Sequence, residues 1–164
     1  MFLDLKRIFI TENAALPIEC ELDLSDLQFA GGYPLIKPVI AKGKVENRAG
    51  VVYLRVKLSA VYSAPCDRCG ENAEKPLEIE VDRVIVESLS GEDTGEYIIA
   101  EGMKLDLDET LTSEVVFAVP QKHLCKETCL GRCFKCGKNL NEGECSCEKR
   151  EIDPRLLALK DLLN

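Results

Sequence analysis

The cysteines of this 164-residue chain are the feature that most constrains its fold. Eight of the nine form four close pairs, and these pairs are Cys66 and Cys69, Cys125 and Cys129, Cys133 and Cys136, and Cys145 and Cys147. Two thiolates separated by one to three residues can bind one tetrahedral metal ion without backbone strain, and a structural zinc site takes four such ligands. The sequence therefore predicts two zinc ions. Cys20 is left over, most simply as a small buried apolar side chain.

Disulfides are the competing interpretation of paired cysteines, because small secreted scaffolds also contain them. This chain is long enough to bury a core without such crosslinks. Residues Met1–Arg7 hold no long apolar stretch and no cleavage site, unlike a signal peptide. No run approaches the roughly 18 apolar residues that span a bilayer. We therefore expect a cytoplasmic, reduced protein with no membrane contact, in which close cysteine pairs favour metal over disulfide.

The eight cysteines can be divided between two metal ions in more than one way. Residues Cys133–Gly137 have the form of a zinc knuckle, and the pair Cys145 and Cys147 follows after a short loop, which closes cheaply. We therefore assign Cys133, Cys136, Cys145 and Cys147 to one zinc ion, and Cys66, Cys69, Cys125 and Cys129 to the other. In the alternative division Cys125, Cys129, Cys133 and Cys136 share one ion, and Cys66 and Cys69 pair with Cys145 and Cys147 or stay free. The single histidine, His123, could also replace a thiolate, although a packing or surface role is commoner.

Apolar alternation predicts an α+β protein whose N-terminal region is mainly an antiparallel β-sheet. Residues Val51–Tyr62 alternate throughout, and a turn at Asn47–Gly50 joins them to a strand at Val39–Glu46. A third strand at Leu77–Val86 loses its alternation at Arg83, which predicts a β-bulge that buries the neighbouring valines, Val84 and Val86. The cysteine pair that precedes this strand, Cys66 and Cys69, is expected on the tight turn between two paired strands.

The remaining segments have weaker or more local patterns. We expect strands at Phe2–Phe9 and Ile18–Leu22 and a loop at Phe29–Pro38. Asp106 is spaced as the N-cap of a helix that Pro120 ends, although Val115–Val119 could instead form a short strand. A second helix is expected to begin at Asp153 and Pro154. We therefore divide the chain into a β-rich domain with one helix at its end, residues 1–120, and a Cys-rich zinc-binding segment with a C-terminal helix, residues 121–164.

The charge of the chain is unevenly distributed. The formal net charge is −8, and a protein this acidic is a poor non-specific binder of nucleic acid. The region Glu71–Glu114 has fourteen acidic and three basic residues, whereas Gln121–Leu140 has five basic residues and one acidic residue. The five cations are Lys122, Lys126, Arg132, Lys135 and Lys138. They are the expected contacts with RNA or a partner, although they could equally offset the nearby thiolates.

Nothing in the residues points to an enzyme. A catalytic zinc ion needs an open coordination position, and four thiolates leave none. The sequence contains no H-E-x-x-H, G-x-S-x-G or Walker motif, and one histidine offers few options for base catalysis. We therefore expect neither a catalytic activity nor a small-molecule substrate.

The cysteine-rich third of the chain resembles the YceD family of bacterial and plastid proteins. The similarity is most specific over Leu124–Asn141, Cys145–Cys147 and Ile152–Arg155, and it extends upstream to Cys66–Cys69. Family members are described as large ribosomal RNA subunit accumulation proteins. The resemblance implies a cytoplasmic factor for the accumulation or processing of 23S rRNA, with an rRNA precursor or a basic large-subunit ribosomal protein as its partner. It implies no catalytic activity.

Three further hypotheses concern how such a chain would act. The acidic region Glu71–Glu114 could hold a basic ribosomal protein until rRNA competes for it, although charge runs often only keep a domain soluble. The paired thiolates could instead form a redox or zinc sensor, because thiolates in basic surroundings are reactive. An iron–sulfur protein is the third possibility, because four cysteines also hold such clusters, but the spacing differs from that of ferredoxins.

Overall fold

The computed structural model describes residues 1–29, 31–89 and 95–147. The main sheet has five strands, in the order β2 (Ala15–Leu22), β3 (Val39–Arg48), β4 (Val51–Pro65), β5 (Asn72–Val86) and β6 (Tyr97–Ile99). Strands β2 to β5 are antiparallel, and β6 runs parallel to β5. A second sheet pairs β1 (Phe2–Asp4) with β7 (Lys104–Asp106). Among the described residues the helices are α1 (Lys6–Ile10), α2 (Leu107–Ala118) and a 3₁₀ turn, η1 (Glu101–Met103), so the fold is α+β as predicted.

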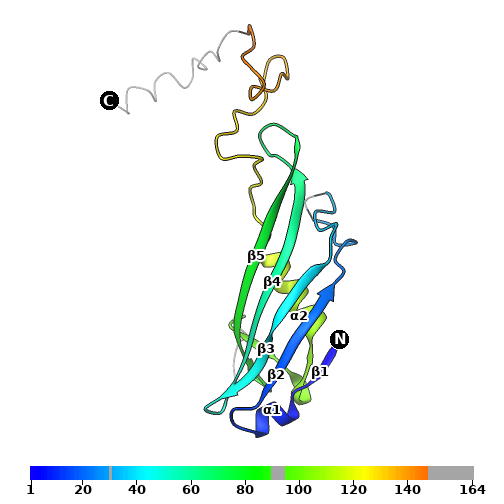
Figure 1. Ribbon diagram of the computed structural model, residues 1–164, viewed down its shortest axis with the longest axis vertical. Helices are drawn as coiled ribbons and strands as arrows, with labels where there is room; N and C mark the ends of the chain where they lie inside the picture. The colour runs from blue at the N-terminus through cyan, green and yellow to red at the C-terminus, as the bar shows by residue number, and fades with distance from the viewer. Residues whose placement is uncertain (30, 90–94, 148–164) are drawn as a thin grey trace, which may run out of the picture.

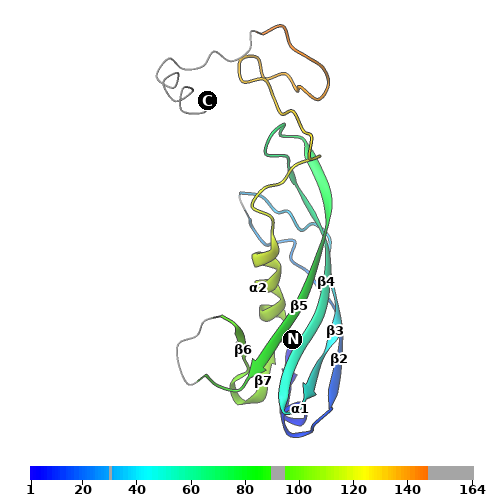
Figure 2. The same ribbon diagram turned by 90° about the vertical axis from the view of Figure 1, so that its left-hand side faces the viewer.

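The molecule is elongated because β4 and β5 are much longer than their neighbours. They pair without interruption from Val52 and Ile85 to Pro65 and Asn72, so their hairpin extends past the ends of β2 and β3 (Figure 1). Helix α2 lies on one face of the sheet, and the chain that leaves it runs to the tip of this hairpin (Figure 2). The described cysteine-rich residues, 121–147, therefore lie at the opposite end of the molecule from α1 (Figure 1).

The core lies between α2 and the inner face of the sheet. Every second residue of β4 from Val52 to Tyr62 is buried, as the alternation predicted. Leu107, Leu111 and Val115 of α2 are also buried, at spacings that put them on one side of the helix. Asp106 caps this helix by accepting hydrogen bonds from the N–H groups of Asp108 and Glu109, so the predicted helix is confirmed and the alternative strand is wrong.

The predicted β-bulge in β5 is wrong. Arg83 pairs with Leu54 in the same register as the rest of the strand, and Ile85 is buried while Val84 and Val86 are half-buried. Arg83 therefore occupies an inward-facing position in an unbroken strand. The guanidinium of Arg83 is tolerated beside the core because its Nε donates to the carboxylate of Glu114 on α2 at 3.0 Å. This ion pair compensates the positive charge.

The N-terminal prediction is also wrong in part. Residues Phe2–Phe9 do not form one strand but divide into β1 and the short helix α1. The helix is favoured because Leu5 and Ile8, three residues apart, are both buried in the core. The predicted strand at Ile18–Leu22 lies within β2. In the loop predicted at Phe29–Pro38, Phe29 and Gly32 form an isolated bridge.

Two predictions are not decided by this fold. The C-terminal helix predicted at Asp153 lies outside the described residues. The domain boundary predicted at residue 120 stays a prediction. Among the described helices, none is both long and apolar enough to cross a membrane.

Candidate metal centres

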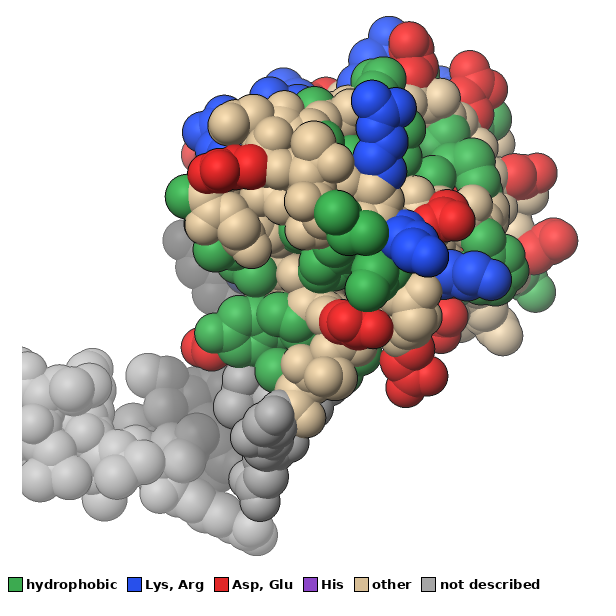
Figure 3. Space-filling model, turned by 90° about the horizontal axis from the view of Figure 1, so that it is seen from below, with side chains coloured by type: hydrophobic (Ala, Val, Ile, Leu, Met, Phe, Trp, Pro, Cys, Tyr) green, Lys and Arg blue, Asp and Glu red, His purple; other side chains and the backbone are tan. Residues whose placement is uncertain are grey.

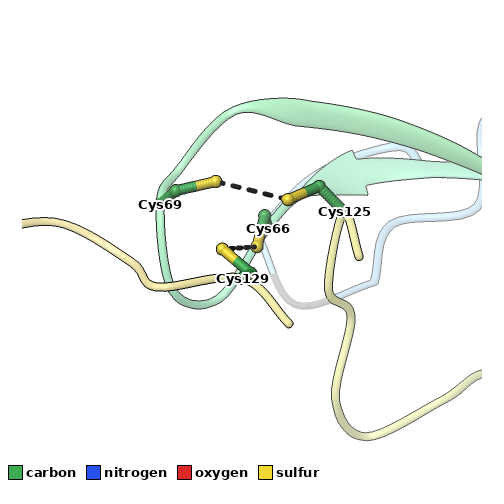
Figure 4. A group of neighbouring side chains, drawn as sticks. All are labelled: Cys66, Cys69, Cys125 and Cys129. Carbon is green, nitrogen blue, oxygen red and sulfur yellow. Dashed lines mark hydrogen bonds between the residues drawn. The ribbon is translucent and has the colours of Figure 1, made fainter. Parts of the chain in front are cut away.

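The first cysteine cluster forms where the β4–β5 hairpin meets the chain that follows α2. Cys66 and Cys69 lie on the hairpin turn, which Gly70 closes with a φ of +72° and an N–H bond to the Cys66 carbonyl. Cys125 and Cys129 approach this turn from the later segment, and the four sulfur atoms point toward one another (Figure 4). All four Sγ atoms lie within 4.8 Å of one another.

The spacing of these sulfur atoms fits a bound ion. The Sγ atoms of Cys66 and Cys129 are 3.8 Å apart, and those of Cys69 and Cys125 are 3.6 Å apart. Zinc–sulfur bonds in a tetrahedral site put neighbouring sulfur atoms about 3.8 Å apart. The nine cysteines all lie among the described residues, and none forms a disulfide. Cys66, Cys69 and Cys129 are buried, so a metal ion here would be enclosed by protein.

Polar contacts that involve no cysteine sulfur hold the two halves of this cluster together. Asp67 donates its N–H to the His123 carbonyl at 2.8 Å, and its carboxylate accepts the His123 N–H at 2.6 Å. The His123 ring is buried, with Nε2 3.0 Å from the Ala73 carbonyl and its edge against Tyr62. His123 is therefore a packing residue that fixes the segment before Cys125, and it does not join the sulfur cluster.

The second cluster lies further along the same segment. The Sγ atoms of Cys133, Cys136, Cys145 and Cys147 also lie within 4.8 Å of one another. Cys133 and Cys136 occupy a knuckle in which Gly137 donates its N–H to the Cys133 carbonyl at 2.8 Å. This cluster is more open than the first, because Cys136 is exposed and Cys145 and Cys147 are half-buried. The structure thus groups the cysteines as in the first of the two divisions, and Cys20 is half-buried against the core.

The thiols of each cluster differ widely in acidity. Burial raises the pKa of the Cys66 thiol, but backbone N–H groups outweigh it and lower this pKa to about 6. In the second cluster backbone N–H groups lower the pKa of Cys133 to about 6. Burial raises the pKa of Cys125 to about 12, and a hydrogen bond with Cys136 raises that of Cys147 to about 12. Thiolates packed this closely repel one another, and a cation would relieve the repulsion.

The five predicted contact cations are all exposed, and the side chains of Arg132 and Lys138 also bond to backbone carbonyls. Arg132 donates from Nε to the Cys69 carbonyl, and Lys138 donates from Nζ to the Glu144 carbonyl at 2.8 Å. The others are Lys122, Lys126 and Lys135. Two large apolar side chains in the same segment are also exposed, Leu130 (68 %) and Phe134 (65 %). Sequence reasoning missed this pair, although apolar residues between cysteines and cations were a visible signal.

Sequence reasoning also missed three residues whose side chains support the first cluster. Arg68 donates to the Cys129 carbonyl at 2.7 Å. Asn139 donates to the Glu71 carboxylate at 2.7 Å, and Asn141 donates from Nδ2 to the Cys129 sulfur at 3.3 Å. The Asn141 bond lowers the pKa of the Cys129 thiol, against the effect of burial. No sequence pattern marks these residues, because their partners lie at other points of the chain.

Several carboxylates of the acidic region are already paired with cations. Glu74 pairs with Lys37, Glu78 with Lys57, and Asp82 with Arg55. At the end of the molecule that carries α1, acidic and basic side chains are likewise interspersed (Figure 3). The uneven charge along the sequence is therefore partly evened out across the folded sheet.

These features define a class of protein: a β-sheet with a helix on one face, and two four-cysteine clusters at the tip of its longest hairpin, built largely from the chain that follows the helix (Figure 2). A family model described as Large ribosomal RNA subunit accumulation protein YceD matches residues 54–163. The chain belongs to the YceD family, and the resemblance of its cysteine-rich segment is confirmed. No curated protein and no solved structure matches it significantly.

Proposed function

We propose that this protein is a non-enzymatic, zinc-binding factor of large ribosomal subunit biogenesis that acts in the cytoplasm. In this role it supports the accumulation or processing of the large-subunit rRNA. Membership of the YceD family supports the biological role. The two four-thiol clusters are the observation on which the molecular part rests.

Zinc is the proposed occupant because each cluster offers four thiolates and, within the described part of the chain, no further ligand. Four sulfur ligands close the coordination shell, so the ions would stabilise the fold rather than catalyse a reaction. Metal analysis of protein purified anaerobically tests this, with two zinc ions per chain and a colourless solution expected. A brown solution that contains iron would identify an iron–sulfur protein instead, and the absence of both metals would refute the proposal.

The surface proposed to contact the precursor subunit lies along the cysteine-rich segment, beside both clusters. Lys122, Lys126 and Lys135 supply positive charge, and the exposed Leu130 and Phe134 supply apolar contacts. Single-stranded RNA is bound by this combination, because cations neutralise phosphates and aromatic rings stack on bases. The paired charges of the sheet make its outer face a weaker site for a basic protein.

Co-sedimentation of the tagged protein with large-subunit precursors tests the proposed surface. We expect Lys122→Ala/Lys126→Ala to weaken co-sedimentation, and its salt slope to fall by about 0.7 for each lost phosphate contact. The matched control is Lys42→Ala/Lys57→Ala, because these lysines are ion paired on the sheet. An equal loss of co-sedimentation in both variants would contradict the proposed role of this surface. Association that survives nuclease treatment would point to a basic ribosomal protein as the partner.

Thiol-based sensing is a second candidate function, and the exposure of Cys136 favours it. Peroxide would then release zinc from the second cluster before the first, and partner binding would change with that release. Partner binding that stays constant after zinc release would exclude sensing.

A further inference from the structure

The two cysteine clusters pack against each other through polar side chains that are not candidate ligands. Arg132, in the knuckle of the second cluster, donates from Nε to the carbonyl of Cys69 in the first. Asn139 at the end of the same knuckle donates to Glu71, which directly follows the first hairpin turn. The knuckle therefore rests on the hairpin turn that carries half of the first cluster.

Asn141 makes the most direct connection between the clusters. Its Nδ2 donates to the sulfur of Cys129 at 3.3 Å, and its Oδ1 accepts the N–H of Leu130 at 2.9 Å. One amide thus holds both the side chain of a candidate ligand and the backbone that follows it. Asn139 orients this amide, because its Oδ1 accepts from the Asn141 N–H at 3.1 Å and from Nδ2 at 2.8 Å.

The position of Asn141 in the sequence links its contact with Cys129 to the second cluster. Asn141 lies between Cys136 and Cys145, in the loop that the second cluster closes. A metal ion bound by the second cluster would restrict this loop and keep Asn141 against Cys129. Groups that hydrogen-bond to a metal ligand typically change metal affinity by 10–100-fold.

We propose that the two metal sites are thermodynamically coupled, and that Asn141 is the positioning residue that couples them. This inference rests on the proposed metal binding. A metal ion in the second cluster raises the affinity of the first, and by linkage an ion in the first raises the affinity of the second by the same factor. The metal affinity of the first cluster, which is buried at the junction with the sheet, then depends on whether the more exposed second cluster holds an ion.

The test measures the occupancy of each cluster separately in the full chain. At a series of buffered zinc concentrations under reducing conditions, alkylation of Cys66 and Cys69 is quantified by peptide mass spectrometry. Protection of these two thiols reports the first cluster. We expect their protection midpoint to shift to a 10–100-fold higher zinc concentration in Cys145→Ser/Cys147→Ser, which lacks the second site.

Asn141→Ala leaves all eight cysteines in place and is expected to give a similar shift, so the test does not depend on the folding of the serine variant. Combining the two changes should add little, because both act through the same contact. Asn72→Ala, which changes an exposed asparagine at the start of β5, is the control and should leave the midpoint unchanged.

An unchanged midpoint in both Asn141→Ala and the serine variant would overturn the coupling. Fully additive shifts in the combined variant would overturn the role of Asn141. If zinc never protects Cys66 and Cys69 in the unaltered protein, the metal binding itself fails, which is a different result.

Discussion

Asn47 shows how one side chain can join segments that are distant in the sequence. It is buried beside the β3–β4 turn, and its Nδ2 donates to the carbonyl of Ile8 at 2.8 Å and to that of Phe9 at 3.3 Å. These carbonyls lie at the end of α1, where no helical N–H remains to satisfy them. Its Oδ1 accepts the N–H of Gly50 at 3.0 Å, so the same amide also closes the turn.

We expect Asn47→Ala to lower the free energy of unfolding by about 2 kcal/mol, because it leaves buried backbone groups without partners. Urea denaturation measures this change. Asn72→Ala, at an exposed site, should change stability by less than about 0.5 kcal/mol. Equal effects of the two variants would show that the Asn47 contacts contribute nothing specific.

At the scale of single residues, the sequence predicted the grouping of the cysteines well and the residues that support them poorly. Close cysteine pairs have few physical interpretations, so the eight cysteines could be assigned to the two groups that the structure brings together. Asn141 and Arg68 act through contacts with residues on other segments, and an isolated amide or guanidinium in a sequence does not reveal its partner. Such supports can be predicted only once the packing of the segments is known.

At the scale of elements, Gly43 allows β3 and β4 to lie close together. A Cβ atom on Gly43 would lie 2.1 Å from the Arg55 carbonyl oxygen and 2.6 Å from the Val56 Cα. Both are backbone atoms of the paired strand, so no side chain can move aside to make room.

Gly43→Ala should therefore destabilise the fold by about 1–3 kcal/mol, the usual range for overpacking, because two central strands must separate locally. Thermal or urea unfolding measures the change. The control is Gly32→Ala, because a Cβ atom there meets nothing within 4 Å. A Gly43→Ala variant as stable as the unaltered protein would show that the strands can shift at low cost.

The elements predicted best are those whose burial repeats regularly. Strand β4 is buried on one face along its length, and this periodicity is visible in the sequence. Strand β5 was misjudged at Arg83, because its partner Glu114 lies on a helix 31 residues away. Helix α1 was missed because five residues are too few for a helical pattern to be distinguished from a strand.

At the scale of the whole molecule, metal loading should depend on pH through the thiols of both clusters. Near neutral pH, Cys66 and Cys133, with a pKa of about 6, are thiolates, whereas Cys125 and Cys147, with a pKa of about 12, hold their protons. A metal ion binds thiolates, so it must displace the protons of Cys125 and Cys147. Loading should therefore release protons, and zinc affinity should rise with pH.

The sign of this dependence follows from proton competition in the apo protein. As the pH falls below about 6, Cys66 and Cys133 also bind protons, and zinc then competes with more of them, so its affinity should fall more steeply. Chelator competition at several pH values gives the affinity, and calorimetry in buffers of different ionisation enthalpy gives the proton release. Cys20→Ser, outside both clusters, should reproduce the unaltered curve. A zinc affinity that does not vary with pH would contradict thiolate coordination, because zinc can bind these thiols only by displacing protons from sulfur.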